Sequence, residues 1–173
     1  MIKKTEKRIL SPKASGIFKM EIVSNSVHQT QRIGELLSKQ INPGDIICLF
    51  GNLGSGKTVL TKGIGQGLGI RKAEVISPSF ILIRPYTQGK IPLYHFDLYR
   101  LNKVSDILAL GYEEYLYGRG VTVIEWADRL KKLMPRDFLK IELCFKSDLK
   151  RSLKVSAFGS RYKKLLNSLK KML

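Results

Sequence analysis

The sequence has few of the features that mark secreted, disulfide-stabilised or membrane-spanning proteins. Only two cysteines occur in 173 residues, Cys48 and Cys144, and both lie within apolar runs rather than at metal-like spacing. We interpret them as buried, reduced thiols in a cytoplasmic protein. There is no run of about 18 apolar residues, and no apolar segment follows the basic start. We therefore expect neither a membrane span nor a secretory signal.

Acidic residues are also scarce. The chain has 14 Asp and Glu against 31 Lys and Arg, a formal net charge of +17. Residues 1–20 and 146–173 together account for +13 of this excess. Basic ends of this kind can bind nucleic acid, and they can equally be solvated lysine-rich termini. Aromatic side chains, on which bases could stack, are not interleaved with the basic residues, and this weakens the case for tRNA binding. Contact with tRNA through these ends therefore stays an open alternative.

What is present is sufficient for one folded domain, because 43% of the residues are hydrophobic. Short apolar runs bounded by turns alternate with helical patterns along the chain. We expect strands over residues 46–50, 80–86, 91–98, 121–124, 139–145 and 153–158. Helices are expected over residues 30–40, 58–68, 104–110, 127–133 and 161–173. The strands around Gln88-Gly89-Lys90 predict a hairpin inserted into an α/β fold.

The most specific motif lies between the first predicted buried strand and the helix that follows it. It matches G-x-x-x-x-G-K-[ST], the phosphate-binding loop, at Gly51, Asn52, Leu53, Gly54, Ser55, Gly56, Lys57 and Thr58. Glycines let the backbone N–H groups point at phosphate oxygens, and the helix dipole favours the anion. Lys57 adds a positive charge and Thr58 a hydroxyl for Mg²⁺. The motif predicts a nucleoside triphosphate site in a three-layer sandwich with a central mixed β-sheet.

The rest of the sequence favours ATP over GTP. The segment Asn102-Lys103-Val104-Ser105 nearly supplies a guanine-reading motif, but its aspartate arrives one position late, at Asp106. A small-molecule kinase would need an arginine-rich lid, and no compact segment of that kind is present. ATP is therefore the predicted nucleotide. Three alternatives stay open beside an ATPase: an ATP-gated binding module, an RNA-binding NTPase and a small-molecule kinase.

Two acidic residues end apolar strands and are candidates for the Mg²⁺ ligand and for positioning water: Asp97 and Glu125. His95 lies two residues before Asp97, so the two share one strand face, with Tyr94 and Phe96 on the other. His95 can be a hydrogen-bonded structural histidine or a functional one. The single tryptophan, Trp126, can equally belong to the core or to the site.

Five motifs occur together in the order and spacing of the TsaE (YjeE) family, which this chain resembles over about residues 22–158. They are GNLGSGKT (51–58), SPSF (77–80), HFDLYRL (95–101), GYEE (111–114) and IEW (124–126). The resemblance implies a small bacterial ATPase that binds ATP with Mg²⁺ and hydrolyses it slowly alone. It also implies stimulation by a TsaB–TsaD heterodimer, which adds the threonylcarbamoyl group to an adenosine of tRNAs reading ANN codons. In the family, the ATPase is thought to reset that complex between turnovers.

Residue roles also follow from the resemblance. Thr58 and Glu125 would bind the metal, Asp97 and Lys57 would serve hydrolysis, and Thr30 would lie near the nucleotide. Ser79 stands where the family generally has Thr, in a switch-like segment near the γ-phosphate; a Ser keeps the hydroxyl but loses the methyl that restricts χ1. His95 and Trp126 are candidates for switching or partner contact. No arginine stands out as one that contacts the phosphates.

The domain organisation that we expect has three parts. Residues 1–20 form a flexible basic extension, residues 21–158 form the ATPase domain, and residues 159–173 form a basic C-terminal helix that packs on the domain or extends from it. Only the middle part belongs to the shared pattern of the family.

Overall fold

The computed structural model describes residues 18–173, and most of the predicted basic extension lies outside them. Residues 18–20 correct that prediction, because they belong to the first strand, β1 (Phe18–Ser24). Met20 and Ile22 pack against the core, whereas Lys19 and Glu21 are exposed. This alternation is the period of a half-buried strand, and it went unrecognised because it covers so few residues.

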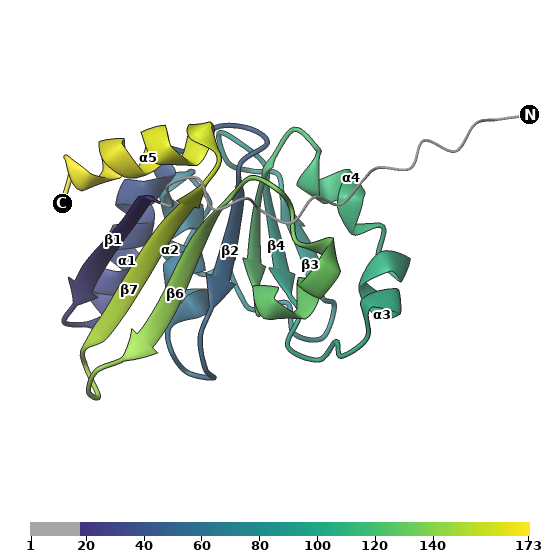
Figure 1. Ribbon diagram of the computed structural model, residues 1–173, viewed down its shortest axis with the longest axis horizontal. Coiled ribbons are helices and arrows are strands. Elements are labelled where there is room, and N and C mark those ends of the chain that lie inside the picture. Colours follow the sequence, from purple (N-terminus) through teal and green to yellow (C-terminus); the bar gives the residue numbers. More distant parts are fainter. Residues whose placement is uncertain (1–17) are drawn as a thin grey trace, which may run out of the picture.

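The remaining elements follow the predicted alternation of strands and helices (Figure 1). The strands are β2 (Ile46–Phe50), β3 (Ile83–Tyr86), β4 (Leu93–Asp97), β5 (Val121–Glu125), β6 (Phe138–Phe145) and β7 (Arg151–Phe158). The helices are α1 (Val27–Ser38), α2 (Lys57–Gly67), α3 (Val104–Ala109), α4 (Tyr112–Leu116) and α5 (Ser160–Lys170), with a 3₁₀ segment, η1 (Ala127–Leu133). Helix α4 was not predicted, because five residues are too few to show a helical period.

The strands form one mixed sheet in the order β1-β7-β6-β2-β5-β4-β3. Strand β2 lies parallel to β5 and β6, and β4 lies parallel to β5. The other pairs are antiparallel, including the predicted β3–β4 hairpin. Strand β3 begins at Ile83 rather than at the predicted residue 80, because residues 78–82 form a turn in which the Ile81 and Leu82 N–H groups donate to the Pro78 carbonyl.

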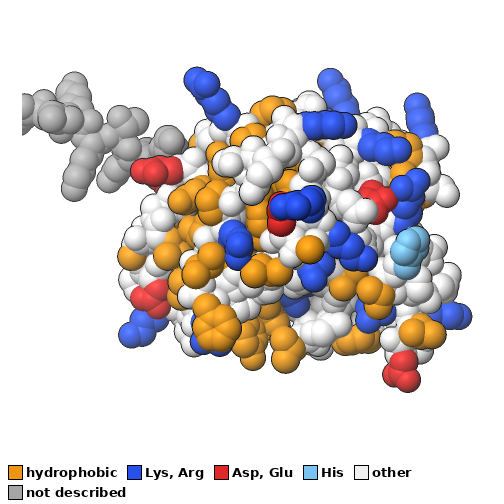
Figure 2. Space-filling model, turned by 180° about the vertical axis from the view of Figure 1, so that it is seen from behind, with side chains coloured by type: hydrophobic (Ala, Val, Ile, Leu, Met, Phe, Trp, Pro, Cys, Tyr) orange, Lys and Arg blue, Asp and Glu red, His pale blue; other side chains and the backbone are white. Residues whose placement is uncertain are grey.

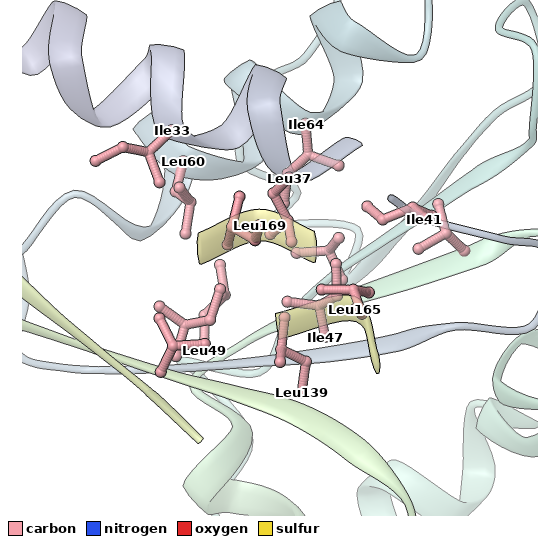
Figure 3. Packing of buried hydrophobic residues seen from close by; sticks show 14 of the residues in the cluster. Ile33, Leu37, Ile41, Ile47, Leu49, Leu60, Ile64, Leu139, Leu165 and Leu169 are labelled. Carbon is pink, nitrogen blue, oxygen red and sulfur yellow. The ribbon is translucent and has the colours of Figure 1, made fainter. Parts of the chain in front are cut away.

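Helices cover both faces of the sheet, which makes the predicted three layers. Ile47 and Leu49 of β2 face one cluster, which includes buried side chains of α1, α2 and α5 (Figure 3). Ile46 and Cys48 point to the opposite face, where the second cluster contains side chains of α3, α4 and η1. A central strand buried on both faces explains why its sequence is apolar throughout.

The two thiols differ in burial. Cys48 is fully buried, and burial raises the pKa of its thiol. Cys144 is only half-buried, so the expectation of two buried thiols holds for one of them; both are free. Among residues 18–173, no helix has the length and apolar character needed to cross a membrane.

Candidate nucleotide-binding site

The segment from β2 to α2 is the loop in which the motif predicts phosphate binding. Gly51 and Gly56 have φ values of 134° and 105°, a region in which L-residues are strained. Gly51 is also sterically required, because a Cβ there would collide with the Leu143 carbonyl oxygen of β6. Gly56 directly precedes Lys57, the first residue of α2. The loop therefore lies at the N-terminus of a helix, where backbone N–H groups favour an anion.

Lys57 lies in this loop and is buried, with 4% of its surface exposed. Its Nζ donates to the Gly51 and Asn52 carbonyls at 2.7 and 2.9 Å. The same ammonium lies 4.0 Å from the centroid of the Trp126 ring, a cation–π contact. Burial lowers the pKa of Lys57, and the carboxylates of Glu125 and Asp97 act in the opposite direction. The chain thus holds a cation at the place where the loop would receive phosphate.

Glu125 ends β5 beside the loop and is almost fully buried. The Thr58 hydroxyl donates to its Oε2 at 2.8 Å. The other carboxylate oxygen, Oε1, lies 2.7 Å from His95 Nε2 and 3.4 Å from the Thr61 hydroxyl. The two residues with the predicted metal role therefore touch one another. Three side chains fix the carboxylate between them.

The donors present suit a magnesium ion that also binds substrate phosphates. Thr58 and Glu125 offer hard oxygen atoms, which Mg²⁺ prefers, and Mg²⁺ is usually held by one or two protein groups besides the phosphates and waters. In the part of the chain that the structure describes, no cluster of three or more His, Cys, Asp and Glu side chains could hold a metal by itself. The donor set fits a nucleotide-bound Mg²⁺ rather than a resident ion.

Asp97 ends β4 and lies opposite Glu125 in the parallel β4–β5 register. Its Oδ2 accepts hydrogen bonds from the Ser77 and Ser79 hydroxyls, each at 2.5 Å. Its Oδ1 accepts from the backbone N–H of Tyr99 at 3.1 Å. Asp97 thus connects the end of the strand to the segment over residues 77–80, which the family resemblance predicts to lie near the γ-phosphate.

A cleft of about 240 Å³ brings these groups together. Its walls are the loop, the start of α2, the ends of β4 and β5, and the serine segment: Leu53, Gly54, Gly56, Lys57, Thr58, Val59, Ser77, Ser79, Asp97, Tyr99, Glu125 and Trp126. Trp126 is half-buried, lines the cleft and also packs against the second hydrophobic cluster, and its φ of 58° is unusual for a tryptophan. The cleft opens at the carboxyl ends of the parallel strands, the usual ligand-binding edge of such sheets.

Five predicted site residues are not among the walls of the cleft: Gly51 and Asn52 of the loop, and Thr30, His95 and Ser55. Thr30 is fully buried on α1, where its hydroxyl bonds Ser24 and the Ser26 carbonyl, so the structure does not bring it together with the loop. His95 is fully buried behind Glu125, and its Nδ1 has no hydrogen-bond partner within residues 18–173. Ser55 is a buried residue of the loop itself, and its hydroxyl has no partner among the described residues either.

Two residues of the site were not singled out from the sequence. Thr61 bonds Glu125 because it lies three positions after Thr58 and shares its helix face. Ser77 bonds Asp97 together with Ser79, because the two serines are two residues apart in the same turn. In both cases the sequence could have identified the residue by its short spacing from a predicted site residue, Thr58 for Thr61 and Ser79 for Ser77.

Comparison with known proteins gives a consistent result. A family model described as "Threonylcarbamoyl adenosine biosynthesis protein TsaE" matches residues 24–153. The TsaE protein of Bacillus subtilis is 40% identical over 141 residues, which is 82% of this chain and 87% of the relative. That of Treponema pallidum is 38% identical over 137 residues, 79% of this chain and all of the relative. A crystal structure of Bacillus subtilis YdiB superposes with a TM-score of 0.81 at 33% identity, covering 92% of this chain and 99% of that one.

Proposed function

This chain belongs to the TsaE family of threonylcarbamoyl adenosine biosynthesis proteins, and from that premise we propose that it is a cytoplasmic, magnesium-dependent ATPase. Its hydrolysis would serve formation of the threonylcarbamoyl group on an adenosine of tRNAs that read ANN codons. The relatives are named for tRNA threonylcarbamoyladenosine biosynthesis, which supports the pathway. The ATPase activity is inferred from the residues of the cleft.

One observation carries the proposal: two carboxylates end adjacent parallel strands beside a complete phosphate loop. Asp97 and Glu125 are register partners, and both are at least 97% buried, with 3% and 2% exposed. Carboxylates are rarely buried without a function or a partner. A site that only bound nucleotide would need one of them for the metal; the second is available to position a water molecule.

The proposed reaction is in-line attack of water on the γ-phosphate. Lys57 would neutralise negative charge that develops on the phosphate oxygens. Asp97 would orient the attacking water, held in place by its bonds from Ser79 and Ser77. When bound, Mg²⁺ would supply further charge neutralisation. Thr58 and Glu125 would hold it, and His95 would keep Glu125 oriented from behind.

Binding of a protein partner is supported by apolar side chains near the cleft. Leu53, Phe80 and Ile81 are 70%, 83% and 59% exposed. In Figure 2 hydrophobic side chains gather along the lower edge of the molecule, where the loops after β2 and β4 lie in Figure 1. Exposed apolar side chains beside a site favour an interaction surface. We propose that a TsaB–TsaD-type complex docks here and that nucleotide hydrolysis resets this complex between turnovers.

The Asp97→Ala variant tests whether hydrolysis itself is needed. We expect it to bind ATP with nearly wild-type affinity and to hydrolyse it at least about a hundredfold more slowly, since it loses one positioned group. Lys57→Ala is the matched variant that loses binding. Calorimetry measures the binding, and phosphate release measures the hydrolysis. If tRNA modification proceeds at the normal rate with Asp97→Ala, the chain is an ATP-gated binding module instead.

A further inference from the structure

The structure brings the two ends of the described chain together at one edge of the sheet. Strand β1 pairs with β7 although the two lie at opposite ends of the sequence. Residues 18–24 and 138–173, which include β1, β6, β7 and α5, contain eleven Lys and Arg against three Asp and Glu. The positive charge of two distant parts of the sequence therefore gathers on one side of the fold, where it attracts anions.

One face of β1, β7 and β6 has no helix over it, and we call it the open face. The opposite face of these strands packs on the cluster that contains side chains of α1, α2 and α5. Among the described residues of the three strands, only Phe138 and Phe158 reach the second cluster. In Figure 1 the open face is turned toward the viewer, and α1 and α2 lie behind it. A hollow of about 430 Å³ lies on this face.

Two lysines flank a serine across the hollow. Ser156 of β7 is the register partner of Lys19 on β1 and of Lys140 on β6, and all three residues line the hollow. Lys19 is exposed and makes no ion pair with any residue in the range 18–173. Lysines and hydroxyl groups are the side chains that commonly hold the phosphates of a nucleic acid.

A third lysine matches the acidic residues of the open face. Lys154 of β7 lies between Glu21 and Glu142 in the register of the three strands. The Lys140 ammonium lies 3.6 Å from a Glu142 oxygen, in a pair whose side chains are 32% and 43% exposed. Such solvent-exposed pairs are weak and can be exchanged for a phosphate. With three lysines and two glutamates, the open face has a net positive charge.

The fold also places aromatic rings beside these lysines, although none is interleaved with the basic residues in the sequence. Phe158 lines the hollow and stacks on Phe138, with ring centroids 4.6 Å apart and an interplanar angle of 5°. The Lys140 ammonium lies 4.6 Å from the centroid of the Phe50 ring on β2. Phe158 and Phe50 are both half-buried, so each ring is partly accessible. Accessible rings beside lysines suit unpaired bases, whereas an anionic membrane surface needs the charge alone.

We propose that the open face binds single-stranded RNA, such as an unpaired loop. The phosphates contact the three lysines of the face, Lys19, Lys140 and Lys154, and a base stacks on Phe158. This inference goes beyond the proposed ATPase, because no residue that lines the hollow also lines the nucleotide cleft. Lys57→Ala, which should lose nucleotide binding, should therefore bind RNA as the wild type does. The two proposals can fail separately.

The test measures binding of a fluorescent, unmodified tRNA transcript that reads an ANN codon, by anisotropy at several salt concentrations. The open-face variant replaces three lysines with glutamine: Lys19→Gln, Lys140→Gln and Lys154→Gln. We expect its Kd to rise at least about tenfold at about 100 mM salt. The slope of log K against log salt should become shallower by about 2–3, since each lost phosphate contact contributes about 0.7–0.9.

A matched control removes the same charge from exposed positions outside the three strands: Lys72→Gln, Lys90→Gln and Lys103→Gln. Its Kd for the transcript should change less than about threefold, because general attraction between distant charges is screened by salt. An unchanged melting temperature shows that each variant is folded. Wild-type affinity in the open-face variant, or equal losses in both variants, would overturn the proposal.

Phe158→Leu tests the base contact separately from the charge. Leucine still packs against Phe138 but has no ring, so the Kd for the transcript should rise about fivefold or more while the salt slope stays the same. An unchanged Kd would overturn the base contact. If the open-face variant loses binding to vesicles that contain phosphatidylglycerol but binds the transcript as the wild type does, the face is a membrane-binding surface and the assignment to RNA fails.

Discussion

At the residue scale, Asp97 and its two serines are the part of the site whose behaviour is easiest to test. Ser77 and Ser79 donate to the same carboxylate oxygen, and their hydroxyls also lie 2.8 Å from one another. Each serine can therefore hold Asp97 in part when the other is absent. The two hydroxyls thus link the serine segment to the end of β4 through one carboxylate oxygen.

We expect the serine variants to be non-additive. Ser79→Ala or Ser77→Ala alone should lower the rate of ATP hydrolysis only a few-fold, whereas the double variant should lose about tenfold more than the product of the single losses, because residues that share a partner couple. Phosphate-release kinetics measure all three, with ATP affinity as the control. A double variant whose loss equals the product of the single losses would show that the two serines act independently of one another, which contradicts a shared role in holding Asp97.

The sequence identifies most of these residues but not their contacts. Glu125 and Asp97 were predicted because each ends an apolar strand, the position at which an acid can bind Mg²⁺ or position water. The bonds from Thr61, Ser77 and His95 depend on side-chain directions in three dimensions. Thr30 shows the limit most clearly, because its burial under β1 follows from a strand that the pattern did not reveal.

At the element scale, the packing of α1 on α2 positions the start of α2 and therefore the loop. The two helices approach closely through glycines: a Cβ at Gly63 would collide with the Gln31 carbonyl, and a Cβ at Gly34 would collide with the Leu60 carbonyl. Above the sheet the contact continues through Ile33, Leu60 and Ile64 (Figure 3). The apolar spacing predicts both helices, but a spacing cannot show which glycines allow contact.

Gly63→Ala should therefore destabilise the fold although alanine favours helices. Backbone atoms must move to accept the methyl group, which costs about 1–3 kcal/mol and exceeds the propensity gain of about 1 kcal/mol. Urea unfolding followed by circular dichroism measures the change in the free energy of unfolding. The control is Lys62→Ala on the same helix, which adds no methyl group at the contact between the helices. Gly69→Ala cannot serve as the control, because the φ of Gly69 is +91° and alanine would be strained there. A Gly63→Ala variant as stable as wild type would contradict the close contact.

At the scale of the whole molecule, the basic ends are the feature whose role is still a prediction. Helix α5 buries Tyr162, Leu165 and Leu166 against the sheet, so deleting it would remove part of the core. The charge must be tested without deleting the helix. Lys164, Lys170 and Lys171 are exposed on α5 and its C-cap.

If the basic ends contact tRNA, replacing these three lysines with glutamine should weaken tRNA binding and flatten its dependence on salt. Each phosphate contact that is lost lowers the slope of log K against log salt by about 0.7–0.9. Filter binding at several salt concentrations measures the slope, and an unchanged melting temperature shows that the fold is intact. Identical affinity and slope in variant and wild type would leave these lysines as solvated surface charge.

The fold class could be predicted at this scale because a buried strand, a glycine loop and a helix occur in sequence, and because the strands and helices alternate. The mixed sheet and the three layers are confirmed. The pairing of β1 with β7 could not be foreseen, since contacts between the two ends of a chain leave no local pattern.

The decisive measurement is steady-state ATP hydrolysis with Mg²⁺, by this protein alone and after addition of its TsaB and TsaD counterparts. We expect slow hydrolysis by the protein alone and a clear increase with both counterparts, and we expect no such increase in Asp97→Ala. Fast hydrolysis that is indifferent to them, or that rises only with a small-molecule acceptor, would contradict this expectation and indicate a stand-alone NTPase or a kinase.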